Sequence, residues 1–230
     1  MGLDLNQLIY FAPAFVIAIA VHEASHALSA TLLGDPSPRA AGRLSLNPLR
    51  HLDPLGTITL FLVGFGWGKP VYVNPAHFRV PWRTGMAITS FAGPLSNLVT
   101  ASLVGMALRF FLFPAVVPWL LASSGMSGSV ITYSVKLLGI VVYINVLLAI
   151  FNLIPLPPLD GFSVLMGLLP SKLAARIAPL AQYGPGILLL LFFVPFVLHV
   201  NLIGGVILPP IEATTRVILG QSLARVLLGM

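Results

Sequence analysis

Long apolar segments dominate this sequence and restrict the folds that are open to it. Four of them are long enough to cross a bilayer as helices, at about residues 8–33, 84–113, 130–153 and 185–208. Only 8% of the residues are charged and 57% are hydrophobic, whereas soluble domains carry roughly 25% charged residues. We therefore expect an all-α polytopic membrane protein with about four to six transmembrane or membrane-embedded helices.

The connection between the first two spans, residues 34–83, is rich in proline, glycine and basic residues. Its apolar run Leu55–Trp67 is too short for a spanning helix, which needs roughly 17–25 residues, so we expect a partly re-entrant element. Residues 71–73, Val-Tyr-Val, predict a short strand. Further along, we expect a short helix at 161–170, a loop at 171–184 and a mildly amphipathic tail at 209–230 that lies on the membrane surface.

The distribution of basic residues predicts how the chain is oriented in the membrane. The 34–83 region holds six lysines and arginines, the 171–184 loop holds two, and the 114–129 loop holds none. Because cytoplasmic loops carry the excess of basic residues, the first two regions are predicted to face the cytoplasm. The N-terminus and the 114–129 loop then lie outside.

Cysteine content and charge exclude several kinds of site and partner. The chain has no cysteine, so disulfides and thiolate metal sites are excluded and histidine, aspartate and glutamate remain as metal ligands. The net charge of +6 comes from loop residues without a clustered basic patch. We therefore expect the lipid bilayer, and no nucleic acid, as a partner.

One short motif places ionisable groups inside the first apolar segment. Residues 22–26 read His-Glu-Ala-Ser-His. Two histidines four residues apart share one helix face, so both His22 and His26 can bind one metal ion. The adjacent Glu23 can move protons to and from water at that metal. Ionisable side chains at membrane depth are rare, which favours a functional interpretation.

A catalytic zinc ion takes three protein ligands and leaves one position for water. Asp160 is the best third candidate, because the 130–153 span returns to the same side just before it. The proline-rich stretch 155–158 cannot be helical and would hold Asp160 in one orientation. His51, His77, Asp53 and Asp35 are weaker candidates in predicted loops; turn and cap chemistry explains His51 and Asp53.

Glu23 and three asparagines within apolar segments have two interpretations each. Glu23 is predicted to act as a general base; the alternative is a buried glutamate paired with arginine or lysine, but no basic residue lies within a helical turn of it in sequence. Asn152 is predicted to stabilise a transition state, because it adjoins the proline-rich stretch. For Asn97 and Asn145 we favour hydrogen bonding between helices.

Two separate motifs together resemble one known family. His22–His26 matches the first signature, and Asn152–Gly161 the second signature, of the site-2 protease family of intramembrane zinc metalloproteases, peptidase family M50. The Gly93–Asn97 and Gly68–Pro75 regions are also similar to family elements. The resemblance implies one zinc ion per chain bound by His22, His26 and Asp160, Glu23 as a catalytic residue, and a small membrane-associated β-hairpin at Gly68–Pro75 that handles substrate.

The same resemblance implies hydrolysis of peptide bonds in or near transmembrane segments. The expected substrates are single-span membrane proteins or residual signal peptides, cut near the cytoplasmic side of a prokaryotic cell membrane. We expect one integral-membrane metalloprotease domain over residues 1–230, with a catalytic core at about 8–170 and a C-terminal span and tail at about 171–230. No PDZ-like or CBS-like regulatory domain is recognisable.

Two other functions use the same residues. A multi-pass metal transporter or metal-binding protein would need a series of ligands across the membrane, and the sequence shows one cluster. An inactive scaffolding member of the family would not require Glu23. The substitution Glu23→Gln distinguishes these functions, because it should abolish proteolysis and leave metal binding intact.

Overall fold

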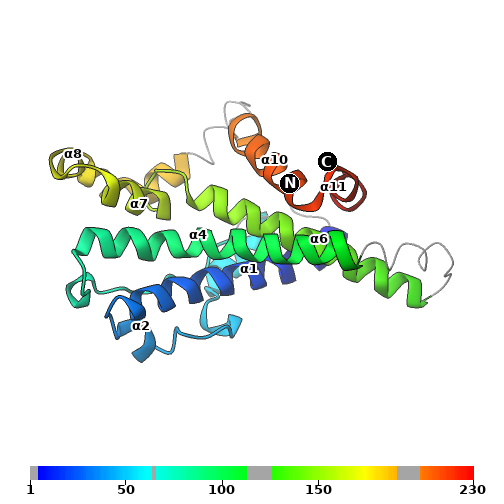
Figure 1. The fold of residues 1–230 in the computed structure, drawn as a ribbon, viewed down its shortest axis with the longest axis horizontal. Helices are drawn as coiled ribbons and strands as arrows, with labels where there is room; N and C mark the ends of the chain where they lie inside the picture. The colour runs from blue at the N-terminus through cyan, green and yellow to red at the C-terminus, as the bar shows by residue number, and fades with distance from the viewer. Residues whose placement is uncertain (1–4, 64–65, 113–125, 191–202) are drawn as a thin grey trace.

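Three long antiparallel helices form the frame of the computed structural model, which describes residues 5–63, 66–112, 126–190 and 203–230. They are α1 (Leu5–Leu32), α4 (Trp82–Ala107) and α6 (Met126–Asn152). Figure 1 shows that α1 and α6 run in one direction and α4 in the other. The end of α1, the start of α4 and the end of α6 therefore meet at one side of the bundle.

Length and composition make these helices suitable for crossing a membrane. Four helical stretches among the described residues are long and apolar enough, namely Leu8–Leu32, Trp82–Leu112, Val130–Asn152 and Ser171–Leu190. In the second, a π-helical turn, η3 (Leu108–Leu112), continues α4. At 1.5 Å per residue, a helix of about 20 residues spans the hydrocarbon core of roughly 30 Å. The predicted all-α polytopic membrane protein is confirmed.

Small residues allow the three long helices to approach closely. Helix α4 packs against α1 and α6, and α1 also packs against α6. Ala14 and Ala18 of α1 and Ala101 of α4 are completely buried. Bulkier side chains of α6, such as Ile140 and Ile144, fill the space beside the two α1 alanines. Close approach of this kind is how helices associate in a membrane, where no hydrophobic effect draws them together.

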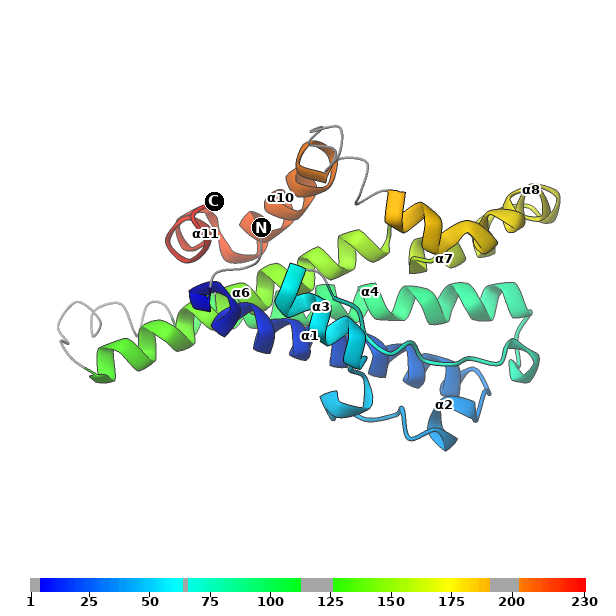
Figure 2. The ribbon, with the colours of Figure 1, turned by 180° about the vertical axis from the view of Figure 1, so that it is seen from behind.

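The connection between α1 and α4 forms short helices joined by extended backbone. In chain order these are α2 (Ser37–Ala40), the 3-10 helix η1 (Pro48–Arg50), α3 (Pro54–Val63) and the 3-10 helix η2 (Pro75–His77). Helix α3 lies across α1 on the face seen in Figure 2. It is too short to span, as the sequence predicted, and its Leu60 joins the core with α1 and α6.

The predicted strand at Val71–Val73 and the β-hairpin at Gly68–Pro75 are wrong for the described residues. The only β-bridge there is an isolated one between Leu52 and Gly68. The backbone is extended, and two of its N–H groups have acceptors outside any strand: Lys69 donates to the carbonyl of His51, and Val71 donates to the Glu23 side chain. Among the described residues, no second strand pairs with the segment.

The chain after α6 also differs from the sequence prediction. A short helix α7 (Asp160–Leu168) forms as expected and packs on α4. The stretch 171–184, predicted as a loop, is helical, with α8 (Ser171–Ile177) followed by the 3-10 helix η4 (Ala178–Tyr183). Good helix formers follow Pro170, which suits a helix start. The predicted last span lies partly outside the described residues, since 191–202 are not described.

The C-terminal residues fold back onto the bundle. A π-helical turn, η5 (Ile203–Ile207), leads into α10 (Leu208–Leu219), and α11 (Gln221–Leu228) follows. Both α10 and α11 pack against α6 and bury Ile211, Leu219 and Leu223 in a second core cluster. One apolar side of the amphipathic tail is thus covered by protein, whereas Val217 and Val226 are exposed.

Candidate metal centre

Two imidazole rings face each other in the second half of α1. His22 and His26 lie one helical turn apart, and their Nε2 atoms are 3.0 Å apart. The two rings are nearly perpendicular, and both side chains are buried. Because the two ring nitrogens lie this close in an apolar helix, both can bind the same cation, and each has little space for a hydrogen-bond partner of its own.

Asp160, at the first residue of α7, completes a triangle of donor atoms. Its Oδ2 lies 3.1 Å from His22 Nε2 and 3.3 Å from His26 Nε2. A tetrahedral zinc ion with ligand bonds of about 2.0–2.1 Å holds its ligands roughly 3.3 Å apart, so the donor set fits zinc. Among the described residues, this is the single group of three histidine, cysteine or acidic side chains that could hold a metal ion. A series of sites across the membrane, as a transporter needs, is not seen there.

Buried acceptors hold both histidines in the tautomer that a metal ligand needs. His22 Nδ1 lies 2.6 Å from Asn97 Oδ1. The Asn97 amide nitrogen donates to the Ala18 carbonyl and to Asn145 Oδ1, so Asn97 Oδ1 is the acceptor and His22 Nδ1 carries the proton. On His26, Nδ1 donates to the Thr89 carbonyl at 2.7 Å. Each Nε2 therefore presents its lone pair toward the centre.

Asn97 thus does more than the predicted packing between helices. It lies fully buried on α4, and Asn145 behind it on α6 is buried as well. Its contact with a candidate ligand is a functional role that sequence reasoning missed. The sequence motif Gly93–Asn97 could have indicated this role, but nothing in the sequence says which helix those residues face.

Gly93 gives the histidines their space. A Cβ atom at this position would lie 2.5 Å from His26 Nε2 and 2.6 Å from His22 Cε1. Real Cβ atoms essentially never come this close to another heavy atom. Helix α4 can therefore pass the centre at this distance only because residue 93 has no side chain.

Glu23 lies beside the three donors and lines the same cavity, whose volume is about 530 Å³. The side chain is buried, and its Oε2 accepts a hydrogen bond from the Val71 N–H at 3.1 Å. Arg43 Nη2 lies 3.9 Å from the same oxygen. The basic partner of the alternative interpretation is thus present near Glu23, and it comes from the connection after α1 rather than from α1 itself.

Asn152 also lines this cavity, at the last residue of α6. One of its amide hydrogens is used within the helix, where Nδ2 donates to the Leu148 carbonyl at 3.0 Å. Among the described residues the second amide hydrogen has no acceptor, which leaves it for a ligand in the cavity. The proline-rich stretch that follows carries the chain from Asn152 to Asp160, so that both residues reach the same cavity.

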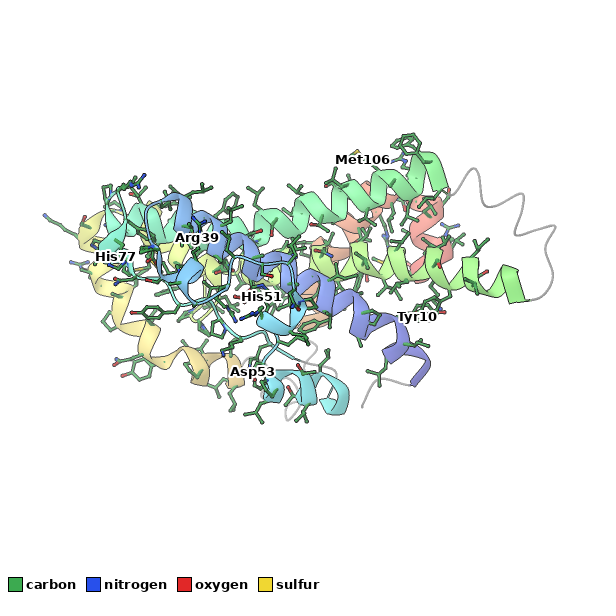
Figure 3. The ribbon with its side chains drawn as sticks, turned by 90° about the horizontal axis from the view of Figure 1, so that it is seen from below. Tyr10, Arg39, His51, Asp53, His77 and Met106 are labelled. Carbon is green, nitrogen blue, oxygen red and sulfur yellow. The ribbon has the colours of Figure 1, made fainter. Side chains whose placement is uncertain are left out.

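The weaker candidates from the sequence have structural roles. His51 Nε2 pairs with the Ser45 carbonyl at 2.6 Å, and Asp53 accepts from the Gly56 N–H at the start of α3, as the turn and cap interpretation predicted. His77 pairs with the fully buried Asp35 at 3.1 Å. Figure 3 shows that His51, Asp53 and His77 are spread along the connection between α1 and α4.

Asp35 fixes this connection to the end of α1. Its carboxylate accepts from the N–H groups of Ser37 and Asn74, at 3.0 and 2.7 Å. Burial acts to raise the pKa of Asp35, but these hydrogen bonds and the one from His77 outweigh it and hold the pKa below its usual value of 3.8. The Asp35 carboxylate therefore ties residues 74–77 to the segment that follows α1.

Comparison with known proteins gives a consistent result. Residues 10–192 match the sequence model of peptidase family M50. The chain is 35% identical over 192 residues to "Putative zinc metalloprotease YwhC" of Bacillus subtilis (strain 168), covering 83% of each chain. It is 30% identical over 186 residues to "Putative zinc metalloprotease Rip2" of Mycolicibacterium smegmatis (strain ATCC 700084 / mc(2)155), covering 79% of this chain and 65% of that relative. No solved structure is significantly similar.

Proposed function

Because the chain belongs to peptidase family M50, we propose that it is a site-2-type protease that cuts peptide bonds in or near transmembrane segments. Its family makes it an integral-membrane zinc metalloprotease. One observation supports the finer proposal most directly: His22, His26 and Asp160 point their donor atoms at one spot, and Glu23 lines the same cavity.

In this proposal His22 Nε2, His26 Nε2 and Asp160 Oδ2 hold one zinc ion per chain. Bound zinc would supply a Lewis acid that makes water a nucleophile near neutral pH. Asn97 and the Thr89 carbonyl accept from Nδ1 of the two imidazoles, which leaves each Nε2 to bind the metal and fixes the orientation of the rings. Asp160 adds a negative charge, which favours a divalent cation at a buried position.

Glu23 is the proposed proton carrier. Its carboxylate accepts a proton from the attacking water and delivers it to the nitrogen of the leaving amine. The free amide hydrogen of Asn152 is proposed to donate to the oxygen of the scissile carbonyl as negative charge develops there. Both groups approach the cavity from different elements, α1 and the end of α6, which leaves space between them for an extended peptide.

The proposed substrates are single-span membrane proteins or residual signal peptides. A helical substrate has its backbone hydrogen-bonded internally and must become extended before attack. Residues 70–73 line the cavity in extended form, and among the described residues the N–H groups of Tyr72 and Val73 make no hydrogen bond. An extended substrate can pair with this backbone by strand addition, although no β-hairpin is formed there.

We infer the orientation from the basic residues of the connection between α1 and α4 at this end of the bundle. The six lysines and arginines of residues 34–83 favour the cytoplasmic side for the candidate centre, in a prokaryotic cell membrane. We further propose that residues 1–230 act as one metalloprotease domain. Its catalytic core would be residues 8–170, with the C-terminal span and tail at 171–230.

Zinc content tests the proposal without a known substrate. We expect about one zinc ion per chain in metal-protected, detergent-purified wild type, and sharply less in Asp160→Ala. Glu23→Gln is the matched control: it should retain zinc, because it removes no ligand, and should lose cleavage of any membrane protein that the wild type cuts. Wild type without zinc would overturn the proposal, and equal zinc in Asp160→Ala would remove Asp160 as a ligand.

A further inference from the structure

A buried arginine connects the proposed general base with the segment that lines the cavity. Arg43 belongs to the connection between α1 and α4, and its side chain is only 7% exposed. Its guanidinium donates to two carbonyl oxygens, those of Arg50 and Lys69. The same Nη2 that serves Lys69 lies 3.9 Å from Glu23 Oε2. One side chain thus contacts three separate parts of the chain.

The backbone next to Lys69 completes the arrangement. Val71, two residues after Lys69, donates its N–H to the same Glu23 oxygen at 3.1 Å. Glu23 Oε2 therefore interacts with both Arg43 and Val71, whereas Oε1 has no hydrogen-bond partner among the described residues. A carboxylate held by one oxygen keeps the other available for proton transfer.

Electrostatics give a reason for a cation at this place. A carboxylate inside a membrane protein is costly to leave without a partner. Burial lowers the pKa of Arg43, and the nearby charge of Glu23 opposes that shift. An arginine remains charged under such conditions, since its pKa is very high in water. Its planar fork also fixes several N–H groups in set directions, whereas the ammonium of a lysine is a compact point charge.

We propose that Arg43 is a positioning residue that holds Glu23 and the cavity-lining segment 69–71 in one arrangement. The inference rests on the proposed function for the role of Glu23, but the coupling itself is a property of the folded chain.

A simple structural role makes a different prediction. If Arg43 only joined the Arg50 and Lys69 carbonyls, its removal would loosen the connection irrespective of the side chain at position 23. If Arg43 holds Glu23 and residues 69–71 together, then removal of Arg43 and neutralisation of Glu23 disturb the segment through the same contacts. The effects of the two substitutions on the segment are then non-additive.

Because the chain has no cysteine, one introduced cysteine can report on the segment. The test measures the rate at which a maleimide labels Val71→Cys, alone and combined with Arg43→Met, Glu23→Gln, or both. Val71→Cys keeps the backbone N–H that Glu23 accepts. Arg39→Met, which removes an exposed arginine from the same connection, is the matched control and should label at the parent rate.

We expect Arg43→Met and Glu23→Gln each to speed labelling, and the double substitution to differ by about threefold or more from the product of the single effects. Zinc content should stay at the wild-type level, since no proposed ligand is changed. Independent effects, or parent-rate labelling in Arg43→Met, would overturn the proposal. If Arg43→Met does not accumulate, Arg43→Lys serves instead, because lysine keeps the charge but cannot reach all three oxygens.

The outcome does not depend on whether the chain cleaves a given substrate. A chain without zinc and without cleavage would refute the proposed function, while labelling would still show whether Arg43 couples Glu23 to residues 69–71. Where the wild type cleaves a single-span reporter, Arg43→Met should lower kcat more than it raises KM. A purely structural loosening of the loop would change KM first.

Discussion

A single methyl group added on α4 should strongly weaken zinc binding at the candidate metal centre. In Gly93→Ala the new Cβ would lie 2.5 Å from His26 Nε2 and Cε1 and 2.6 Å from His22 Cε1. Ordinary contacts begin at 3.4 Å. The rings or the helix must therefore move apart by about 1 Å, whereas metal–ligand distances tolerate only about 0.2 Å.

The energetic consequence follows from what holds the rings. Displacement of His22 and His26 strains or breaks their hydrogen bonds to Asn97 and to the Thr89 carbonyl, and each such bond contributes about 0.5–1.5 kcal/mol. Loss of a partner that orients a ligand typically costs 10–100-fold in metal affinity. With both rings displaced, we expect the zinc affinity to fall by about 100-fold or more, which corresponds to roughly 3 kcal/mol.

The assay is zinc retention during titration with a chelator, combined with thermal unfolding of the metal-free protein in detergent. Gly186→Ala is the control, because a Cβ there would meet nothing within 4 Å. Alanine favours a helix over glycine by about 0.8–1.0 kcal/mol, so helix propensity alone would stabilise both variants. If Gly93→Ala bound zinc as tightly as Gly186→Ala, the position of the rings against α4 would be wrong.

Three further substitutions test the surroundings of the centre. Asn97→Ala should weaken zinc binding about 10–100-fold in the same chelator titration, because His22 Nδ1 loses its acceptor. Asp35→Asn should lower the free energy of unfolding above pH 3.8, where the wild-type carboxylate is ionised. Because the pKa of Asp35 is lowered in the folded state, the difference between wild type and variant should shrink as the pH falls through that lower pKa. Thermal unfolding between about pH 3 and pH 6 measures this difference. Thr89→Val should leave the free energy of unfolding within about 1 kcal/mol of wild type or raise it, because the buried Thr89 hydroxyl has no partner among the described residues. A clear loss of stability in Thr89→Val would mean that this hydroxyl has a partner.

Three of the four predicted spans, and the candidate ligands, were accessible from sequence because local patterns carry them. Apolar length identifies a spanning helix, and the four-residue spacing of His22 and His26 puts both on one helix face. Asp160 followed from the order of the spans, which returns the chain to the same side. The apolar length and the histidine spacing are properties of a single segment, and the place of Asp160 follows from the alternating direction of successive spans. None of these inferences requires knowledge of how side chains pack.

Other features were missed because they depend on contacts between distant segments. Arg43 reaches Glu23 only through the fold of the connection after α1, and the acceptor of the Val71 N–H is a side chain on another element. A strand was predicted at Val71–Val73 from composition, yet strand formation needs a partner that the fold does not supply among the described residues. The helix at Ser171–Ile177 was missed because its basic residues suggested a loop.

The separation of the candidate ligands along the chain has a consequence for synthesis. His22, Glu23 and His26 enter the membrane with the first helix, whereas Asp160 follows the third. A nascent chain therefore carries the proposed proton carrier and two candidate ligands long before the third candidate ligand leaves the ribosome. Until α7 docks on α4, a growing chain has no complete candidate centre, and under the proposed function it would be unable to cut membrane proteins inserted beside it.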